Sequence, residues 1–242
     1  MTPGTTQESA AAAEPPFGFL YGNEPHAVVV AGGDLDTPEL RAEAARLVAS
    51  AALCVAADGG LRLLRAIGRW PDLLVGDFDT LAEDEVAEAA AAGVTVLRYP
   101  AAKDATDSEL ALDLVEERGG PRRIYLIGGV GDRVDHTLAN LMMAARLCQE
   151  GRDVTIVAAP AHVAPLVGPG RVSFAGRPGQ PVSLIPLTPS LMGVTTEGLV
   201  YPLHDATLRF GTTFTVSNAL AGERGAFSAR AGRALVVLQR RP

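Results

Sequence analysis

Lysine and cysteine are almost absent from this 242-residue chain, and each scarcity excludes a class of site. The only lysine, Lys103, follows no G-x-x-x-x-G-K-[ST] segment and lies in no V-A-I-K context, so a P-loop and a protein-kinase lysine are excluded. The two cysteines, Cys54 and Cys148, are too few for a disulfide framework or a cysteine-based zinc site. The motifs H-E-x-x-H and G-x-S-x-G are also missing.

Long apolar runs and an excess of positive charge are missing as well. No apolar run reaches the length of a membrane span, and the N-terminus lacks the basic-then-apolar layout of a signal peptide. We therefore expect a soluble cytoplasmic protein with no membrane partner. The formal net charge of -7 argues against nonspecific binding to nucleic acid. Because 48% of the residues are hydrophobic, the chain can bury a sizeable core.

The first two thirds of the chain predict an α/β domain. Residues 1–18 have no apolar period and are interpreted as a disordered tail. Over residues 19–159, apolar runs alternate with helical patterns, which predicts a parallel sheet flanked by helices. The predicted strands lie at 27–31, 53–57, 73–75, 94–99, 124–127 and 154–158. The predicted helices lie at 38–50, 61–67, 81–92, 106–118 and 135–150.

Residues 160–242 predict a small all-β domain, sandwich-like or barrel-like, that follows the parallel sheet. Glycine and proline punctuate short stretches of β character, and no convincing helix follows. Residues 159–170, which contain three prolines, are interpreted as a linker. The predicted strands lie at 171–175, 182–187, 194–196, 207–210, 212–217 and 234–239.

Aspartates follow the first five predicted strands. Ligands of open parallel sheets bind beyond the carboxyl ends of the strands, so these aspartates should line one edge of the sheet. Clustered carboxylates repel one another unless a cation lies among them, and an all-oxygen ligand set suits Mg²⁺ together with substrate phosphates. The segments that follow the strands are G-G-D at 32–34, D-G-G at 58–60, G-D-F-D at 76–79, K-D-A-T-D at 103–107 and G-G-V-G-D-R at 128–133.

Each of these features also has a simpler interpretation. A single G-D-x-D is more often a turn than a metal site. Thr106 and Glu109 fit a capping box, in which Asp107 favours the helix N-terminus electrostatically. Asp135 fits an N-cap, and His136 with Asn140 fits a surface pair one helical turn apart. The chemical interpretation is favoured because all five features occupy the same kind of position.

Four motifs, in this order along the chain, resemble the thiamine pyrophosphokinase family. They are A-A-D-G-G at 56–60, G-D-F-D-T at 76–80, K-D-A-T-D-S-E-L-A-L at 103–112 and G-G-V-G-D-R-V-D-H-T-L-A-N-L at 128–141. Stretches at 193–195, 197–203 and 216–218 resemble the thiamine-binding domain of that family. The resemblance covers about residues 28–237.

The resemblance implies transfer of a pyrophosphoryl group from ATP to the hydroxyethyl group of thiamine, with Mg²⁺ required and thiamine diphosphate and AMP as products. It also implies a homodimer with thiamine sites between subunits. It assigns the catalytic roles to Asp58, Asp77, Asp79 and Asp107, of which the first three are the expected Mg²⁺ ligands. For ATP and its phosphates we expect Gly33, Lys103, Gly128, Gly129, Arg133, Asp135 and His136. For thiamine we expect Asp107, Tyr201, Ser217 and Asn218.

Two residues depart from the family pattern. Thr80 stands where a serine is usual and keeps the hydroxyl, whereas Asp132 stands where a glycine is usual and adds a carboxylate on the phosphate side. Three other functions remain open. One is a pyrophosphokinase acting on another hydroxyalkyl heterocycle, such as a hydroxymethyl pterin. The others are a nonenzymatic nucleotide sensor of the same fold and an unrelated α/β protein with Asp-rich turns.

Overall fold

The computed structural model describes residues 17–32 and 37–240. Its elements up to the end of the parallel sheet are β1 Gly18–Phe19, β2 His26–Val30, α1 Pro38–Ala49, β3 Leu53–Ala57, α2 Gly60–Ala66, β4 Leu73–Gly76, α3 Glu83–Ala91, β5 Thr95–Arg98, α4 Asp107–Glu117, β6 Arg123–Ile127, α5 Val134–Gln149 and β7 Asp153–Val157. The rest are β8 Ala161–Val167, β9 Gly170–Ala175, β10 Pro181–Pro186, β11 Ser190–Glu197, β12 Ala206–Arg209, β13 Asn218–Ala219, β14 Arg224–Ala229 and β15 Arg233–Gln239.

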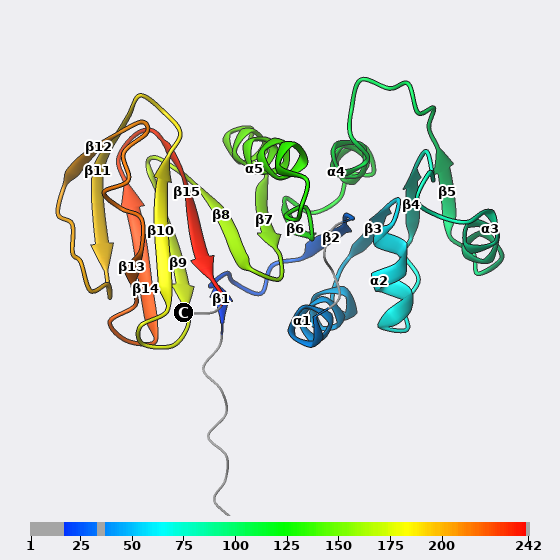
Figure 1. Cartoon of the computed structure of the whole chain (residues 1–242), viewed down its shortest axis with the longest axis horizontal. Helices are drawn as coiled ribbons and strands as arrows, with labels where there is room; N and C mark the ends of the chain where they lie inside the picture. The colour runs from blue at the N-terminus through cyan, green and yellow to red at the C-terminus, as the bar shows by residue number, and fades with distance from the viewer. Residues whose placement is uncertain (1–16, 33–36, 241–242) are drawn as a thin grey trace, which may run out of the picture.

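A single ten-stranded sheet runs through most of the molecule, in the order β13-β10-β15-β8-β7-β6-β2-β3-β4-β5. The pairs from β7 to β5 are parallel, and those from β13 to β7 are antiparallel (Figure 1). Helices cover both faces of the parallel part, as predicted. Its strands are apolar at nearly every position because both faces are buried.

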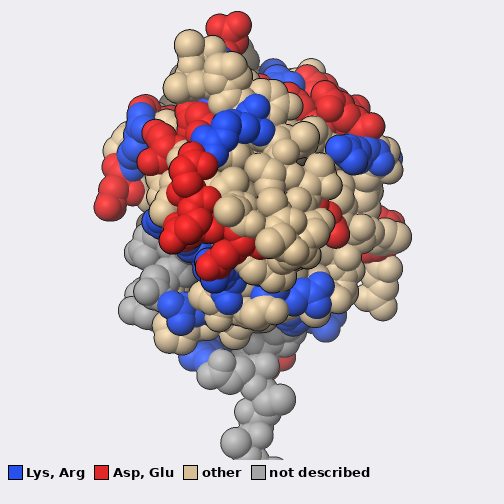
Figure 2. All heavy atoms as spheres, turned by 90° about the vertical axis from the view of Figure 1, so that its right-hand side faces the viewer, with Lys and Arg blue, Asp and Glu red and all other residues tan. Residues whose placement is uncertain are grey.

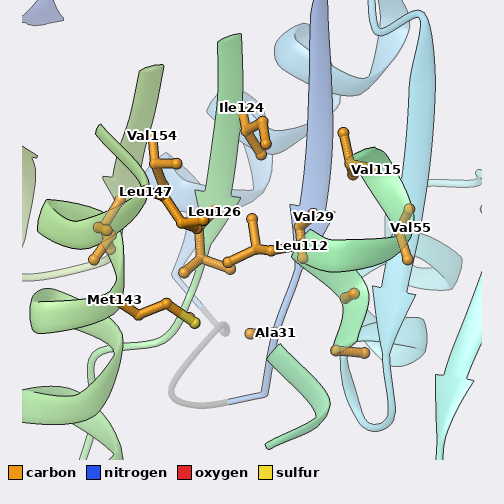
Figure 3. Close-up of a cluster of buried hydrophobic side chains, with 14 of the residues drawn as sticks. Val29, Ala31, Val55, Leu112, Val115, Ile124, Leu126, Met143, Leu147 and Val154 are labelled. Carbon is orange, nitrogen blue, oxygen red and sulfur yellow. The ribbon is translucent and has the colours of Figure 1, made fainter. Parts of the chain in front are cut away.

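Two hydrophobic cores fix the helices to the parallel strands. On one face, α4 and α5 pack through Leu112 and Met143 against Val29 and Leu126 of the sheet (Figure 3). On the other face, α1, α2 and α3 cover a second core that includes Val28. These cores hold the strand ends, and therefore the loops that follow them, in fixed positions.

The strand order reverses between β2 and β6. Strand β2 pairs with β3 on one side and with β6 on the other, so the loops after β2 and β6 leave the sheet in opposite directions. Such a switch point leaves a crevice at the carboxyl ends of the strands. The sequence predicts that the aspartates which follow the parallel strands line this edge of the sheet.

The C-terminal part is a sandwich, as predicted. A second, antiparallel sheet in the order β1-β9-β14-β11-β12 packs on the antiparallel half of the ten-stranded sheet. Phe174 and Phe227 are fully buried in the core between the two sheets. Since β8, β15 and β10 belong to the same sheet as the parallel strands, no break in pairing separates the predicted regions 19–159 and 160–242.

Several boundary predictions are wrong for identifiable reasons. The predicted linker contains β8, whose Pro165 lies beyond the residues that pair with β7 and so interrupts no pairing on that side. The tail predicted for residues 1–18 ends earlier, because Gly18 pairs with Ala175 in β1; residues 1–16 lie outside the described part. The predicted strand at 212–217 consists of turns with an exposed Phe214, and pairing begins only at β13.

None of the helices in the described residues is long and apolar enough to cross a lipid bilayer.

Because one sheet joins the two parts, we expect the chain to unfold in a single cooperative transition. Trp70, the only tryptophan, lies between α2 and β4 and reports on the α/β part alone. Its fluorescence and the far-UV circular dichroism of the whole chain should therefore give coincident denaturation curves. Separate midpoints for the two signals would contradict this expectation.

Candidate functional site

A cavity of about 1130 Å³ opens at the carboxyl ends of the parallel strands. Asp58 follows β3, Asp77 and Asp79 follow β4, and Asp107 begins α4. The structure therefore brings together aspartates that are up to 49 positions apart in the chain, from Asp58 to Asp107. The predicted site residues that line the cavity are Asp58, Asp77, Asp79, Lys103, Asp107, Gly129, Arg133 and His136.

Other predicted residues lie away from the cavity lining. Gly33 falls outside the described residues. Gly128 donates its N–H to the carbonyl of Val157 instead, which ties the loop to β7. Asp135 is exposed and pairs with Arg133 at 2.8 Å on the surface. Tyr201, Ser217 and Asn218 belong to the C-terminal sandwich.

The backbone at the ends of β3 and β4 adopts unusual conformations. Asp58 has a φ of 43° and Phe78 a φ of 62°, both in the left-handed region that costs energy for residues with side chains. Phe78 is buried, and the Arg98 guanidinium lies 4.8 Å above its ring, so packing holds this turn in place. With Phe78 turned into the core, Asp77 and Asp79 remain at the cavity.

Gly76 allows two carboxylates to approach each other. A side chain here would place its Cβ 3.1 Å from the Cβ of Asp58 and 3.3 Å from Oδ1 of Asp107, and the φ of 152° also disfavours any other residue. Asp58 and Asp107 therefore lie on either side of a space that only glycine leaves open.

Burial and the hydrogen bond from Thr80 have opposite effects on the pKa of Asp58. Burial raises the pKa of Asp58, and the negative charges of Asp107 and Asp79 act in the same direction. Hydrogen bonds from the Thr80 hydroxyl to Asp58 Oδ2 and from the backbone N–H of Gly59 oppose this rise without cancelling it. The residue that departs from the family pattern thus uses its hydroxyl to hold a carboxylate.

Lys103 forms ion pairs with two of the carboxylates. Its Nζ lies 3.0 Å from Asp77 Oδ2 and 3.1 Å from Asp107 Oδ1. The hydrogen bond from Lys103 lowers the pKa of Asp77. Burial acts to lower the pKa of Lys103, but Asp77 and Asp107 together outweigh it, so the net shift is upward. The ammonium is therefore charged and anchored.

The cavity has donors suited to a divalent cation but no complete ligand shell. In the described part of the chain, no three His, Cys, Asp or Glu side chains converge closely enough to hold a metal ion alone. However, Asp58 Oδ1 and Asp107 Oδ1 are buried and lack hydrogen-bond partners. Mg²⁺ usually takes one or two carboxylates and completes its shell with water and substrate phosphates. The residues fit an ion that arrives with a phosphorylated substrate.

Helix α5 shapes the glycine-rich loop after β6. Asn140 is buried and donates from Nδ2 to the carbonyl of Gly129 at 2.9 Å, so its interpretation as a surface pair with His136 is wrong. Thr137 Oγ1 accepts from the Gly131 N–H at 3.1 Å. Both polar side chains line the cavity, and sequence reasoning missed them as site residues. The signal was their spacing of three residues, which places both side chains on one face of the helix that follows the loop.

A basic side chain that was also missed, Arg62 on α2, lines the cavity from the other side. It pairs with Glu85 of α3 at 2.9 Å and donates to the carbonyl of Thr80 at 2.7 Å. Figure 2 looks onto the molecule from the end where β5 and α3 lie, and acidic and basic side chains are interspersed on that face. Paired charges of this kind steady the loop that carries Asp79 and Thr80.

The capping interpretation is correct for Thr106 but not for the side chain of Glu109, whose carboxylate pairs with Arg146 at 3.0 Å, and the cap does not compete with the site. Thr106 is the N-cap of α4, and its side chain accepts from the Glu109 N–H at 3.2 Å. Asp107 occupies the first turn, where the helix dipole favours a negative charge. The same cap that starts the helix thus presents Asp107 to the cavity.

In the C-terminal sandwich, Asn218 fixes the backbone of Tyr201. Asn218 is buried; its Nδ2 donates to the Tyr201 carbonyl at 2.7 Å, and its Oδ1 accepts from the Tyr201 N–H at 3.1 Å. Ser217, with a φ of 62°, and Tyr201, whose side chain is 66% exposed, lie next to it at the surface. The structure therefore groups these three residues, far from the aspartates along the sheet.

Comparisons with known proteins agree with this division. Residues 44–156 match the family model for the thiamin pyrophosphokinase catalytic domain, and residues 172–233 match that for the thiamin pyrophosphokinase vitamin B1 binding domain. The chain is 29% identical over 186 residues to thiamine pyrophosphokinase of Bacillus subtilis, which covers 76% of this chain and 86% of that protein.

Solved structures give the same picture. A crystal structure of the Bacillus subtilis thiamine pyrophosphokinase matches with a TM-score of 0.75 and 28% identity, covering 88% of this chain and 98% of that one. The thiamin pyrophosphokinase of Geobacillus thermodenitrificans matches with a TM-score of 0.72 and 30% identity, covering 88% and 97%. Both similarities span the sheet and the sandwich together.

The raised pKa of Asp58 predicts that its charge destabilises the fold. The native state holds the proton more tightly than the unfolded chain, so the ionised form is disfavoured in the native state at pH 7. Asp58→Asn removes that charge, tolerates the left-handed conformation and accepts from Thr80. We expect a melting temperature about 2–4 °C higher at pH 7, corresponding to about 1 kcal/mol.

This gain should shrink as the pH falls through the pKa of Asp58, because the wild-type carboxylate then becomes neutral too. Scanning calorimetry across this range measures both effects. Asp84→Asn, at an exposed aspartate on α3, serves as the control and should give no gain. A lower melting temperature for Asp58→Asn at pH 7 would refute the explanation.

Proposed function

The chain belongs to the thiamine pyrophosphokinase family, and we propose that it transfers the pyrophosphoryl group of ATP to the hydroxyethyl group of thiamine with Mg²⁺. The observation that carries the proposal is the grouping of Asp58, Asp77, Asp79 and Asp107 around one cavity at the switch point of the sheet. The products are thiamine diphosphate and AMP. We place the reaction in the cytoplasm, where ATP is available.

The reaction is a displacement at phosphorus. The thiamine hydroxyl oxygen forms a bond to the β-phosphorus of ATP, the bond to the oxygen shared with the α-phosphorus breaks, and AMP leaves. Mg²⁺ held by Asp58, Asp77 and Asp79 would neutralise negative charge that develops on the phosphate groups. The residues of the chain contribute chiefly by positioning the two substrates and by matching their charges.

We assign the roles by position in the cavity. Asp58, Asp77 and Asp79 would hold Mg²⁺. Asp77 and Asp79 follow β4 and line the cavity, and Asp58 has a buried carboxylate oxygen without a hydrogen-bond partner. We assign the phosphates to Lys103 and to the loop at 128–133 with Arg133, whose guanidinium can contact a phosphate through two nitrogens. His136 of α5 lines the same side.

Asp107 is assigned to thiamine. It faces the cavity from the first turn of α4, where it can orient the hydroxyl group and accept its proton. Thiamine carries a permanent positive charge on its thiazolium ring, which an acidic cavity attracts. Tyr201 would add a contact between its aromatic face and that cation or the pyrimidine ring, worth about 0.5–2 kcal/mol.

A second copy of the chain would complete the thiamine site. Strands β11 and β12 lie at one end of the long axis in Figure 1 and β4 and β5 at the other, so Tyr201 is remote from the aspartates of its own chain. Helix α5 exposes Val134, Leu138 and Met142, spaced four residues apart along one stripe. The sandwich exposes Phe210 and Phe214. A homodimer that buries both apolar surfaces would bring Tyr201 to the partner's cavity.

The activity itself is tested by incubating the purified protein with thiamine, ATP and Mg²⁺ and measuring AMP and thiamine diphosphate. A hydroxymethyl pterin offered in place of thiamine tests the other pyrophosphokinase function. Turnover of the pterin but not of thiamine, or turnover of neither, would refute the proposal.

Loss of one assigned Mg²⁺ ligand should remove most turnover. For Asp77→Asn, we expect kcat/KM to fall by at least about 100-fold, because a neutral amide is a poor ligand for the ion that offsets the phosphate charge. Steady-state kinetics measures the fall, and circular dichroism checks that the fold persists. Asp132→Asn changes another aspartate that lines the cavity and should stay within about threefold of the wild type. Equal activity in all three proteins would end the assignment.

Removal of the Tyr201 ring should weaken thiamine use specifically. For Tyr201→Ala, the loss of about 0.5–2 kcal/mol raises the KM for thiamine about 2-fold to 30-fold and leaves the KM for ATP unchanged. Kinetics with each substrate varied separately measures both constants. Equal increases for thiamine and ATP would contradict the assignment.

Co-expression of Asp77→Asn and Tyr201→Ala chains tests whether the site is shared. In a mixed dimer, one site then combines an intact Asp77 with an intact Tyr201 from the other chain. Random pairing should give about a quarter of the sites wild-type kinetics, with a KM for thiamine below that of the Tyr201→Ala dimers. A chain carrying both changes is the control and should restore nothing. Kinetics of the mixture that show only the raised KM of the Tyr201→Ala dimers would place both residues in the same chain's site.

A further inference from the structure

The only lysine of the chain lies between two carboxylates that belong to different elements. Lys103 is in the loop between β5 and α4, and its side chain is 13% exposed. Its Nζ is 3.0 Å from Asp77 Oδ2, after β4, and 3.1 Å from Asp107 Oδ1, at the start of α4. A single positive charge therefore joins the two elements at the centre of the acidic group.

One ammonium satisfies this group only in part. The ammonium donates a hydrogen bond to Asp77, and it is the one ion-pair partner of the buried Asp107 Oδ1 within the described residues. Asp58, which is 8% exposed, has an unpartnered Oδ1 in the same cavity. Buried carboxylate oxygens without partners are costly, so the site favours a cation of higher charge over the ammonium.

Three arginines, Arg41, Arg62 and Arg133, also line the cavity, and ion pairs engage two of them. Arg62 pairs with Glu85, and Arg133 pairs with Asp135. Both pairs lie on exposed parts of the cavity rim. Lys103 contacts both Asp77 and Asp107, and it therefore lies where a divalent ion would meet Asp77.

We propose that Lys103 is a displaceable counter-ion, which holds Asp77 and Asp107 together until a divalent cation takes its place on Asp77. The proposal rests on the proposed function, since it takes a divalent ion and a nucleotide as the ligands of this cavity. The flexible four-carbon stem of lysine lets the displaced ammonium turn to a new anionic partner.

This exchange links the two ligands. Phosphate oxygens of a nucleotide give the released ammonium a partner, so the metal ion displaces Lys103 more readily when nucleotide is present. Without nucleotide, the ammonium competes with the metal ion, and the protein alone binds it weakly. Lys103 is therefore a positioning residue in the free protein and a phosphate contact in the loaded one.

Titration of the full chain with Mn²⁺ alone, without nucleotide, tests the competition. Electron paramagnetic resonance measures free Mn²⁺ directly. Lys103→Met keeps most of the side-chain length and removes the charge, and we expect it to bind Mn²⁺ at least about tenfold more tightly than the wild type. Lys103→Arg keeps the charge and should bind like the wild type. Equal or weaker binding by Lys103→Met, including no binding by either protein, overturns the proposal.

A second measurement needs no variant and so does not depend on how Lys103→Met folds. Since the chain has one lysine, labelling with ¹⁵N-lysine gives a single side-chain Nζ resonance. Saturating Mg²⁺ should shift this resonance and speed its proton exchange with water, because the ammonium leaves the carboxylates. Asp77→Asn should show faster exchange before Mg²⁺ is added. An Nζ resonance unchanged at saturating Mg²⁺ overturns the proposal.

Failure of this proposal and failure of the proposed function are distinguishable. If the wild type converts thiamine and ATP but Lys103→Met binds Mn²⁺ no more tightly, only the counter-ion exchange is refuted. If the wild type has no turnover, the proposed function fails, and the Mn²⁺ and Nζ measurements still decide whether Lys103 yields its carboxylates to a divalent cation.

Discussion

The repulsion between buried carboxylates is the constraint around which the rest of the site is built. Asp58 and Asp107 approach each other across Gly76, where only the lack of a side chain leaves room. Like charges at such separations oppose folding unless other contacts hold them. Here the holding contacts are local: the Thr80 hydroxyl on Asp58 and the Lys103 ammonium on Asp77 and Asp107. The left-handed turns at Asp58 and Phe78 are held by the packed strands beneath them.

The continuous sheet explains how a chain with two parts keeps them in fixed relation. Strand β8 pairs with β7 at Ile156–Val163 and with β15 along its length, so the sandwich grows from the edge of the parallel sheet. At the other end of the described chain, β1 joins the second sheet before the chain crosses to β2. A connection of this kind keeps Tyr201 remote from the aspartates of its own chain.

The parallel part of the fold was predictable because burial on both faces leaves a plain signal. Strands such as Leu53–Ala57 are uninterrupted apolar runs, and the polar loops between them mark their ends. Strand β14 gave no such signal, since it carries Gly225 and Ala226 where β-branched residues would be expected. Gly225 is required there: a Cβ would lie 2.8 Å from Leu220 and 2.9 Å from Phe174. Close packing between the two sheets depends on the tertiary structure. The β-strand preferences of the residues in β14 therefore could not predict this strand.

The site was predictable only where one rule applied, namely that loops after parallel strands meet at one edge. The rule predicted that the aspartates lie close together. It did not predict the contacts of Asn140 and Thr137, which depend on the path of the glycine-rich loop over α5. It also treated helix capping and cavity lining as alternatives for the segment at 106–107. In the structure, Thr106 caps α4 and Asp107 begins the helix, where the helix dipole favours a negatively charged side chain. Thr106, which caps the helix, and Asp107, which lines the cavity, therefore belong to the same turn of the chain.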